Sequence, residues 1–367
     1  MRIGILIPGF SASESDWSIP VYLNLVRGLA KRHDVRVFPI RYPFTHDSYE
    51  VYGAKVFPFG GGSYTSGLQR WRLIRAVEKS LIRHHQIAPF DVLHAIWGDE
   101  TGYIANRVGG KLGVPSVVSI AGGELVGFAE INYGLQLGRF TSWLVYHAVK
   151  SATRVIAPCT YTEQVLRRYM GNIGGQERIR VVPLGVDTDL FKLPDKEQRT
   201  MEFLHVASLS SIKRQDILLQ IFTRLPNVQL NIVGDGVLRE HLNQLAVNLG
   251  IADRVIFHGE VPHEQLPAYY QQAEFLVITS QHEAFCMAAL EAAACGTLVF
   301  GSQVGVLPEI GITAPVGDIQ GLVERIVGRR RTNSDQRRAQ LRWQVERDYS
   351  LERMTNGILD VYREVVR

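Results

Sequence analysis

Short apolar runs alternate with longer segments of helical periodicity along the whole chain. This alternation predicts strands at 2–7, 34–39, 92–96, 116–120, 154–157 and 179–182 in the first half, and at 202–208, 228–233, 255–257, 275–278 and 298–301 in the second half. It predicts helices at 19–32, 68–85, 101–112, 160–170, 215–225, 238–250 and 284–295. Strands that are apolar throughout and are separated by helices indicate parallel sheets covered on both faces.

The two halves of the alternation meet near residues 183–194. A chain of 367 residues, at roughly 150 residues per domain, is long enough for two domains. We therefore expect two doubly wound α/β domains, with the first ending near Gly185. Ligands of open α/β sheets bind beyond the carboxyl ends of the strands, so we expect the site in a cleft between the domains.

Composition excludes several other classes of protein. Hydrophobic residues make up 46% of the chain and charged residues 21%, which excludes a disordered, collagen-like or membrane-spanning protein. The apolar start of the chain is too short for a signal peptide and is typical of a buried strand, which predicts a cytoplasmic protein. Cys159, Cys286 and Cys295 lack metal-ligand spacing, so we expect reduced, mostly buried thiols and no metal site.

The charge is distributed unevenly along the chain. Residues 1–185 carry a net charge of +8 and residues 186–367 a net charge of −4. This asymmetry has two readings, chance or an anionic partner of the first domain. The helix expected at 68–85 also has two interpretations. Its apolar stripe and its cations could bind an anionic lipid surface, or the stripe could pack on the sheet of the first domain while the cations face water. The run 329–331 of arginines has no interleaved aromatic residues, so we expect no nucleic-acid partner.

Glu283 and Glu291 lie eight residues apart around the expected start of an Ala-rich helix. Eight helical residues rise by about 12 Å, which predicts that both carboxylates point to one side of the site. A helix N-terminus suits a phosphate, and carboxylates accept hydrogen bonds from sugar hydroxyls. From spacing alone, a helix cap and a surface glutamate explain the pair equally well. His94 and His147 are interpreted as core residues.

Further stretches in the second half accompany this pair, and with it they resemble the family-4 retaining glycosyltransferases of the GT-B fold. They are 182–191 (Val-Pro-Leu-Gly-Val-Asp-Thr-Asp-Leu-Phe), 233–236 (Val-Gly-Asp-Gly) with Leu238 and Arg239, 255–262 (Val-Ile-Phe-His-Gly-Glu-Val-Pro), 292–296 and 305–309 (Gly-Val-Leu-Pro-Glu). The resemblance is nearly continuous over 154–318 and weaker before it. It implies an acceptor-side Rossmann-like domain at 1–185, a nucleotide-sugar-binding Rossmann-like domain at 186–349, and a helix at 350–367 that crosses back to the first.

The resemblance also implies roles for individual residues. Glu291 is expected to bind the ribose of a nucleotide sugar, Glu283 to contact the transferred sugar, and Lys213 to neutralise the diphosphate as it departs. The implied donor-binding set comprises Ser208, Arg214, Gly234, Gly259, Glu260, Val261, Ala284, Phe285, Cys286, Met287 and Glu291. The implied acceptor or sugar side comprises Gly9, Ala121, Gly122 and Glu124. No metal and no cofactor are expected, because Lys213 and the helix dipole take the place of a cation.

Some positions depart from the family pattern. Ala207-Ser208-Leu209 replaces the usual Gly-Arg-Leu, so a second diphosphate-binding arginine is missing, and Arg214 is the candidate to substitute for it. Ala121-Gly122 replaces a His-Gly whose histidine contacts the transferred sugar. Cys286 stands where glycine is usual.

The expected function is a metal-independent, retaining hexosyltransferase that uses a donor such as a UDP- or GDP-sugar. The expected acceptor is a glycan, a lipid-linked glycan or a small molecule, as in polysaccharide or glycolipid biosynthesis. Two alternatives stay open: a catalytically weakened nucleotide-sugar-binding protein, and an epimerase or hydrolase on the same fold. Because of its basic first half, the protein is expected in the cytoplasm with a peripheral contact to the inner, anionic face of a membrane.

Overall fold

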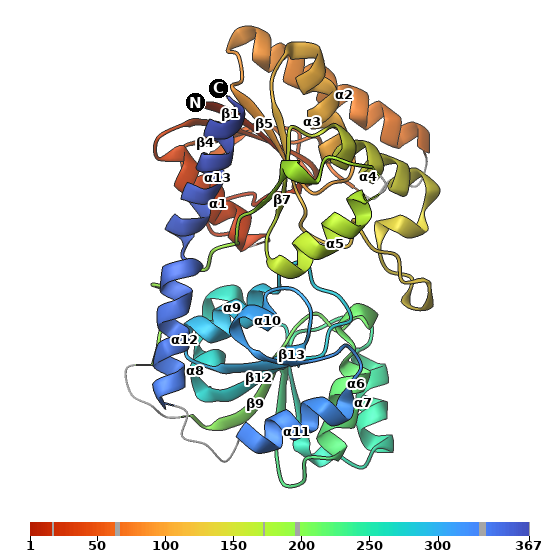
Figure 1. The fold of residues 1–367 in the computed structure, drawn as a ribbon, viewed down its shortest axis with the longest axis vertical. Helices are drawn as coiled ribbons and strands as arrows, with labels where there is room; N and C mark the ends of the chain where they lie inside the picture. Colours follow the sequence, from red (N-terminus) through yellow and green to blue (C-terminus); the bar gives the residue numbers. More distant parts are fainter. Residues whose placement is uncertain (17, 63–66, 172, 195–198, 330–334, 367) are drawn as a thin grey trace. The chain divides into compact units, whose positions relative to one another are not determined.

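A computed structural model describes residues 1–367 except 17, 63–66, 172, 195–198, 330–334 and 367. The chain forms two compact units (Figure 1). Unit 1 comprises Met1–Gly185 and Leu351–Arg367, and unit 2 comprises Val186–Ser350. Arg330 and Arg331 of the arginine run lie outside the described residues.

Unit 1 is built on an eight-stranded sheet in the order β3-β4-β2-β1-β5-β6-β7-β8. Its strands are β1 (Arg2–Gly9), β2 (Asp34–Tyr42), β3 (Tyr49–Val51), β4 (Ala54–Val56), β5 (Val92–Ile96), β6 (Ser116–Ser119), β7 (Arg154–Ala157) and β8 (Ile179–Val181). Its helices are α1 (Pro20–Ala30), α2 (Gly67–Ile87), α3 (Glu100–Leu112), α4 (Arg139–Ser151), α5 (Thr160–Met170) and α13 (Leu351–Val365), with short 3₁₀ turns at Ala129–Ile131, Leu135–Leu137 and Gln176–Arg178. All neighbouring strands are parallel except the β3–β4 hairpin.

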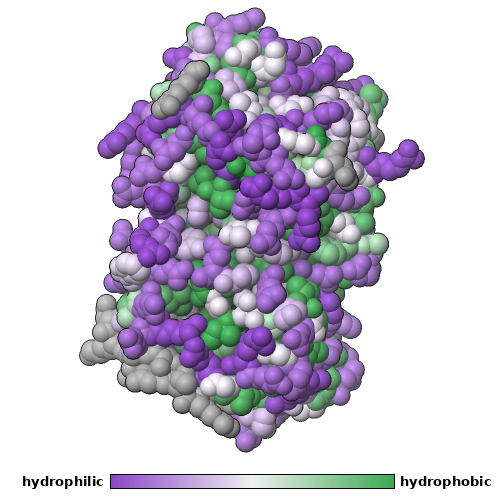
Figure 2. Space-filling view, in the orientation of Figure 1, coloured by the Kyte–Doolittle hydropathy of each residue, from purple (hydrophilic) through white to green (hydrophobic). Residues whose placement is uncertain are grey.

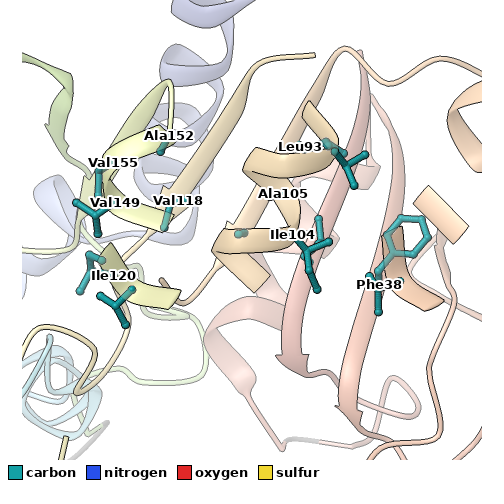
Figure 3. Packing of buried hydrophobic residues seen from close by; sticks show 14 of the residues in the cluster. Phe38, Leu93, Ile104, Ala105, Val118, Ile120, Val149, Ala152 and Val155 are labelled. Atoms are coloured by element: carbon teal, nitrogen blue, oxygen red, sulfur yellow. The ribbon is translucent and has the colours of Figure 1, made fainter. Parts of the chain in front are cut away.

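Helices cover both faces of this sheet because successive strand residues point to opposite sides. On one face, Leu93 and Ala95 of β5 join a core cluster with residues of α2, α3 and α4, of which Figure 3 labels Ile104, Ala105 and Val149. His94, between Leu93 and Ala95, points to the other face and contacts Tyr362 of α13. On that face α13 runs beside α1 (Figure 1). The C-terminal helix is therefore part of unit 1.

Unit 2 contains a six-stranded parallel sheet in the order β11-β10-β9-β12-β13-β14. Its strands are β9 (Met201–Val206), β10 (Leu230–Val233), β11 (Val255–Gly259), β12 (Ala273–Ile278), β13 (Leu298–Ser302) and β14 (Ile312–Ala314). Its helices are α6 (Gln215–Thr223), α7 (Arg239–Asn248), α8 (Leu266–Gln272), α9 (Met287–Ala294), α10 (Leu307–Ile310), α11 (Ile319–Arg329) and α12 (Asp335–Asp348), with 3₁₀ turns at Ser211–Lys213, Ala252–Arg254 and His263–Gln265. The predicted doubly wound α/β class is confirmed for each unit.

Each sheet has a point where its strand order reverses. In unit 1 the chain passes outward from β1 through β2 and then returns to β5 on the other side of β1. In unit 2 it passes outward from β9 through β10 and β11 and returns to β12. Loops diverge at such switch points and leave a crevice for ligands at the carboxyl ends of the strands. Functional side chains are therefore expected at the carboxyl ends of β9 and β12 in unit 2 and of β1 and β5 in unit 1.

Candidate active site

Lys213 and Glu283 meet at the switch point of unit 2. Lys213 lies in the loop that follows β9, and Glu283 lies in the loop that follows β12. The Lys213 Nζ is 2.7 Å from the Glu283 Oε1, and the Ser280 hydroxyl donates to the same oxygen at 2.6 Å. The two side chains are 23% and 11% exposed, so both are largely shielded from water but remain accessible. The structure thus brings together the two residues expected to carry the chemistry.

The two loops are tied to each other through their backbones. The Gln281 N–H donates to the Ile212 carbonyl at 2.9 Å, and the Thr279 hydroxyl donates to the carbonyls of Lys213 and Arg214 at 3.1 and 3.0 Å. These bonds fix the loop of Lys213 against the loop of Glu283. The Lys213–Glu283 geometry therefore belongs to the fold of unit 2 and does not depend on two flexible side chains alone.

Helix α9 begins later than the sequence suggested. The sequence predicts a start at Ala284, directly after Glu283, whereas the helix starts at Met287, so that three loop residues separate Glu283 from it and Glu291 lies on it. Cys286, the residue before the helix, has a φ of 83°, which is the left-handed conformation and interrupts the helical run. The rise calculated between the two glutamates is therefore wrong. Ala284, Phe285 and Cys286 are buried in the loop that leads into α9.

The left-handed conformation explains why the family usually has glycine at the position of Cys286. Glycine adopts a positive φ without steric cost, whereas a residue with a Cβ pays for it. Cys286 therefore stores local strain at the entrance of α9. Burial, together with nearby Glu283, raises the pKa of its thiol far above the ordinary value, so this cysteine is no candidate nucleophile.

Arg214, the candidate to substitute for the missing arginine, binds two side chains near it. Its guanidinium binds both oxygens of Asp216 at 2.9 Å and the Gln281 side-chain oxygen at 3.1 Å. Arg214 also has a φ of 52°, which lies in the left-handed region. Ser208 is exposed, and its hydroxyl lies 3.3 Å from that of Ser210. The structure therefore gives Arg214 a partner of its own within the loop.

Gly234 allows the loop after β10 to pack closely on the loop after β9. A Cβ at Gly234 would lie 2.0 Å from the Ala207 carbonyl oxygen, which no side chain tolerates. The Gly234 N–H donates to the Gly259 carbonyl at 2.7 Å and so connects it to the end of β11. Beyond that end, Glu260 is exposed and Val261 is half-buried. Gly234 thus serves close backbone packing, whereas Gly259 has open space at its Cβ position and a positive φ of 77°.

Glu291, on α9, is only 6% exposed. Its Oε1 lies 3.0 Å from the His263 Nε2, and its Oε2 accepts a hydrogen bond from the Tyr270 hydroxyl at 3.0 Å. Neither His263 nor Tyr270 was singled out from the sequence. His263 lies in a 3₁₀ turn, Tyr270 on α8 and Glu291 on α9, so only the fold reveals these contacts between separate elements.

In unit 1, Glu124 closes the loop that follows β6. Its fully buried carboxylate accepts backbone N–H bonds from Ala121 at 2.9 Å, Gly122 at 2.6 Å and Gly98 at 3.2 Å. Burial raises its pKa above the ordinary value even though these N–H groups act in the opposite direction. Glu124 thus holds Ala121 and Gly122 in place and ties their loop to the one after β5. Gly9 ends β1, opposite Tyr42.

A charged cluster at the end of β5 was missed. Glu100 is fully buried, accepts a hydrogen bond from the Arg41 guanidinium at 2.9 Å, and also pairs with Arg70. Burial acts to raise the pKa of Glu100, but Arg70 and Arg41 outweigh it and hold that pKa low. Burial and the neighbouring Glu100 raise the pKa of Asp99. Asp99 and Glu100, an acidic pair soon after a buried strand, could have indicated this cluster from the sequence. Its arginine partners could not, because they come from β2 and α2.

The described residues contain neither a cluster suited to a metal ion nor a helix suited to span a membrane. No group of three or more His, Cys, Asp or Glu side chains is arranged to hold a metal ion in that part of the chain. No helix among the residues whose positions are given is long and apolar enough to span a bilayer.

Two family models match the chain in consecutive segments. Residues 21–190 match the model "Glycosyltransferase Family 4", and residues 187–323 match "Glycosyl transferases group 1". Among curated proteins, the chain is 28% identical over 345 residues to D-inositol 3-phosphate glycosyltransferase 2 of Catenulispora acidiphila, with 86% of this chain and 73% of that protein covered. It is 39% identical over 145 residues to D-inositol 3-phosphate glycosyltransferase of Mycobacteroides abscessus, and this match spans 36% of the chain and about a third (33%) of that relative's length.

Solved structures show the same fold at low identity. Sucrose-phosphate synthase of Thermosynechococcus elongatus superposes with a TM-score of 0.80 at 20% identity, with 99% of each chain covered. Anabaena HepE in complex with UDP and glucose superposes with a TM-score of 0.73 at 18% identity, again with 99% of each chain covered. The solved structures and the two parallel-sheet units show the GT-B fold. The two family models, which together span residues 21–323, show that the chain belongs to the family-4-like glycosyltransferases of this fold.

Proposed function

We propose that the protein is a retaining hexosyltransferase that moves a sugar from a nucleoside diphosphate sugar to an acceptor hydroxyl. The observation that carries this proposal is the meeting of Lys213 and Glu283, 2.7 Å apart, at the switch point of unit 2 and just before α9. A fixed cation and the positive end of a helix stabilise the negative charge that develops on a departing diphosphate. Glu283 accepts hydrogen bonds from the hydroxyls of the sugar.

The proposed reaction exchanges one bond at the anomeric carbon for another. The bond between this carbon and the β-phosphate oxygen breaks, and the electron pair leaves with the nucleoside diphosphate. The acceptor oxygen forms its bond on the same face, and its proton passes to the departing phosphate oxygen. Lys213 needs no metal ion for its part, because an ammonium group already carries the charge that stabilises the leaving group.

Relatives bear on the donor and the acceptor only by analogy. The solved Anabaena structure contains UDP and glucose, and the names of the curated relatives give inositol phosphate as an acceptor. We propose a UDP- or GDP-sugar as donor and a glycan, lipid-linked glycan or small polyol as acceptor. Unit 2 would then be the donor side and unit 1 the acceptor side.

Two measurements test the reaction. A thermal-shift screen with UDP, GDP and ADP and their sugars should identify a stabilising ligand, because a ligand bound only by the native state raises its stability. With that donor, nucleoside diphosphate should appear only when an acceptor is present, and NMR of the product should show the donor's anomeric configuration. Release without acceptor would indicate a hydrolase or epimerase instead. Binding without turnover of any acceptor would indicate a weakened, nucleotide-sugar-binding protein.

We propose in addition that unit 1 makes a peripheral contact with an anionic membrane, at the inner face. Most of the apolar stripe of α2 does not carry this contact, because Ile74, Val77 and Leu81 are buried in the core cluster of unit 1. This part of the stripe packs inside the unit, as the alternative interpretation predicts. The hydrophobic surface lies instead at the start of α2, where Leu68 is 63% and Trp71 is 38% exposed.

An aromatic cluster extends this surface to α4. Trp71 lies 5.8 Å from Phe140 and 6.4 Å from Trp143 between ring centroids, and Trp143 is 39% exposed. Exposed cations accompany it on α2: Arg72, Arg75 and Lys79. On the face in view, Figure 2 shows mostly hydrophilic residues with small hydrophobic groups between them. Partly exposed tryptophans beside cations favour the interface of an anionic bilayer.

Vesicle co-sedimentation tests the membrane contact. The protein should pellet with vesicles containing phosphatidylserine and stay in the supernatant with phosphatidylcholine alone, and added salt should weaken the binding. Replacing Arg72, Arg75 and Lys79 with Glu should abolish it. A control triple variant, with Glu at Lys31, Arg32 and Lys55, makes the same charge change at exposed positions of other elements and should bind better than the α2 variant. Equal recovery with both vesicle types would contradict the proposal.

A further inference from the structure

Two hydrogen-bond donors from different elements hold the carboxylate of Glu291. His263 lies in the turn after β11 and approaches Oε1 with its Nε2 at 3.0 Å. Tyr270 lies on α8 and donates its hydroxyl to Oε2 at 3.0 Å. An ionised carboxylate only accepts, so the His263 contact requires the proton on Nε2. Each oxygen of Glu291 thus has its own donor, and the orientation of the carboxylate is fixed.

Phe191 packs against both donors. Its ring, 1% exposed, lies 5.3 Å from the His263 ring and 6.0 Å from the Tyr270 ring. The Phe191 N–H donates to the Asp187 carbonyl at 2.9 Å, and Arg342 binds the carbonyls of Phe191 and Thr188. Phe191 is the last residue of the stretch 182–191, to which the proposed reaction assigns no role. The contacts of its ring give this stretch a structural role, because they help to position His263 and Tyr270.

The remaining capacity of the carboxylate matches a pair of neighbouring hydroxyls. Each carboxylate oxygen has two acceptor positions, and one on each oxygen is used by His263 or Tyr270. One position on each oxygen therefore remains for a ligand. Two hydroxyls on adjacent carbons, as in the 2′ and 3′ positions of ribose, can bind one oxygen each. With 6% of the residue exposed, water has little access to replace a missing hydroxyl.

We propose that His263 and Tyr270 are positioning residues that make Glu291 selective for a nucleotide whose ribose has both hydroxyls. This inference rests on the proposed function, and it takes Glu291 as the group that binds the ribose of the donor, as the family resemblance implies. It adds that selection against 2′-deoxy and 3′-deoxy nucleotides depends on two residues that do not touch the ribose themselves. A site built to bond a hydroxyl rejects an analogue that lacks it, because its buried acceptor then has no partner.

Calorimetric binding of nucleotides to the full chain tests the inference. UDP, GDP and ADP are compared first, and the tightest binder is then measured in its 2′-deoxy and 3′-deoxy forms. The wild type should prefer the ribonucleotide by about 10- to 100-fold over each deoxy form, as expected for one charge-assisted hydrogen bond. His263→Ala and Tyr270→Phe should each reduce this preference to about threefold or less. Most of the change should come from weaker binding of the ribonucleotide.

Two further variants separate positioning from general damage. His263→Gln should restore most of the preference, because a glutamine side-chain amide can donate from nearly the same place as Nε2. His241→Ala, at an exposed histidine of α7 in the same unit, should keep the full preference. Melting temperatures of all variants report whether unit 2 stays folded, and His263, which is only half-buried, is the safer substitution.

The outcomes distinguish this inference from the function on which it rests. A full preference in both His263→Ala and Tyr270→Phe, or an equal loss of ribo and deoxy nucleotides, would overturn the positioning role and leave the donor site standing. If Glu291→Gln bound every nucleotide as the wild type does, or if no nucleoside diphosphate bound the wild type, the proposed donor site would fail and the inference with it.

Discussion

The imidazole of His94 and the phenol of Tyr362 are 2.7 Å apart in the interior of unit 1, although 268 residues separate them in the chain. The other ring nitrogen of His94 lies 2.8 Å from the Ser119 hydroxyl. This buried chain of polar groups connects β5, β6 and α13. It is also the reason why His94 belongs to the core and is no candidate catalyst, as the sequence interpretation proposed.

Acid should destabilise unit 1 through His94. Burial lowers its pKa from 6.5 to about 3, so below pH 6.5 the unfolded chain binds a proton that the native state does not bind. The free energy of unfolding therefore falls as pH falls between 6.5 and 3, by about 1.4 kcal/mol per pH unit. Burial lowers the pKa of His205 to about 4, which acts in the same direction in unit 2.

His94→Gln tests this linkage. The variant should be less stable than the wild type at pH 7.5 by about 1–3 kcal/mol, because it disturbs a buried hydrogen-bonded pair. Between pH 7.5 and 5 this difference should shrink by about 2 kcal/mol, because the variant no longer has the proton-linked loss. Urea unfolding followed by tryptophan fluorescence reports mainly unit 1, which contains four of the five tryptophans. A constant difference across this pH range would contradict the account.

The C-terminal helix should be required for the stability of unit 1. Met354, Ile358, Val361 and Tyr362 of α13 are buried, and Glu364 pairs with Arg154 and Arg180. Removing residues 350–367 exposes the core that these side chains cover, so the melting temperature should fall. Because the truncated chain could fail to fold, Ile358→Ala provides a milder form, with an expected loss of about 2–5 kcal/mol. Unchanged melting of the truncated protein would contradict this prediction.

Kinetics should separate the roles of Lys213 and Glu291. Lys213→Ala should mainly lower kcat, since the charge on the leaving group develops in the transition state. Glu291→Ala should mainly raise the KM of the nucleotide sugar, because the ribose is bound before and during the reaction. Each loss should cost about 1.5–3 kcal/mol. Lys192→Ala, at an exposed lysine of the same unit, is the matched control. Wild-type kinetics in both site variants with every donor used would contradict the site assignment.

Long apolar runs made the main strands predictable, whereas very short strands and contacts between separate elements were missed. Strand β5 and helix α5 have the expected bounds, because buried strands and amphipathic helices have strong periodic patterns. The β3–β4 hairpin has strands of only three residues, which is too short for a pattern. The Glu100 cluster and the His263–Glu291 contact depend on residues from separate elements. No spacing in the sequence specifies such contacts before the fold does.

The last prediction concerns the order of stability at position 286. In ordinary backbone, alanine is more stable than glycine by roughly 0.5–1 kcal/mol, because glycine has more freedom in the unfolded chain. At a φ of 83° this order should reverse, since the Cβ of alanine carries the left-handed cost of about 1–2 kcal/mol. Cys286→Gly should therefore be more stable than Cys286→Ala. Cys286→Val should be the least stable of the three, because a β-branched residue fits the left-handed region worst. Chemical unfolding of the three variants measures the order, with the same substitutions at Cys159, which lies in extended backbone at a φ of −160°, as the control. Alanine above glycine at 286 would show that the left-handed conformation costs little there and that the preference for glycine has another origin.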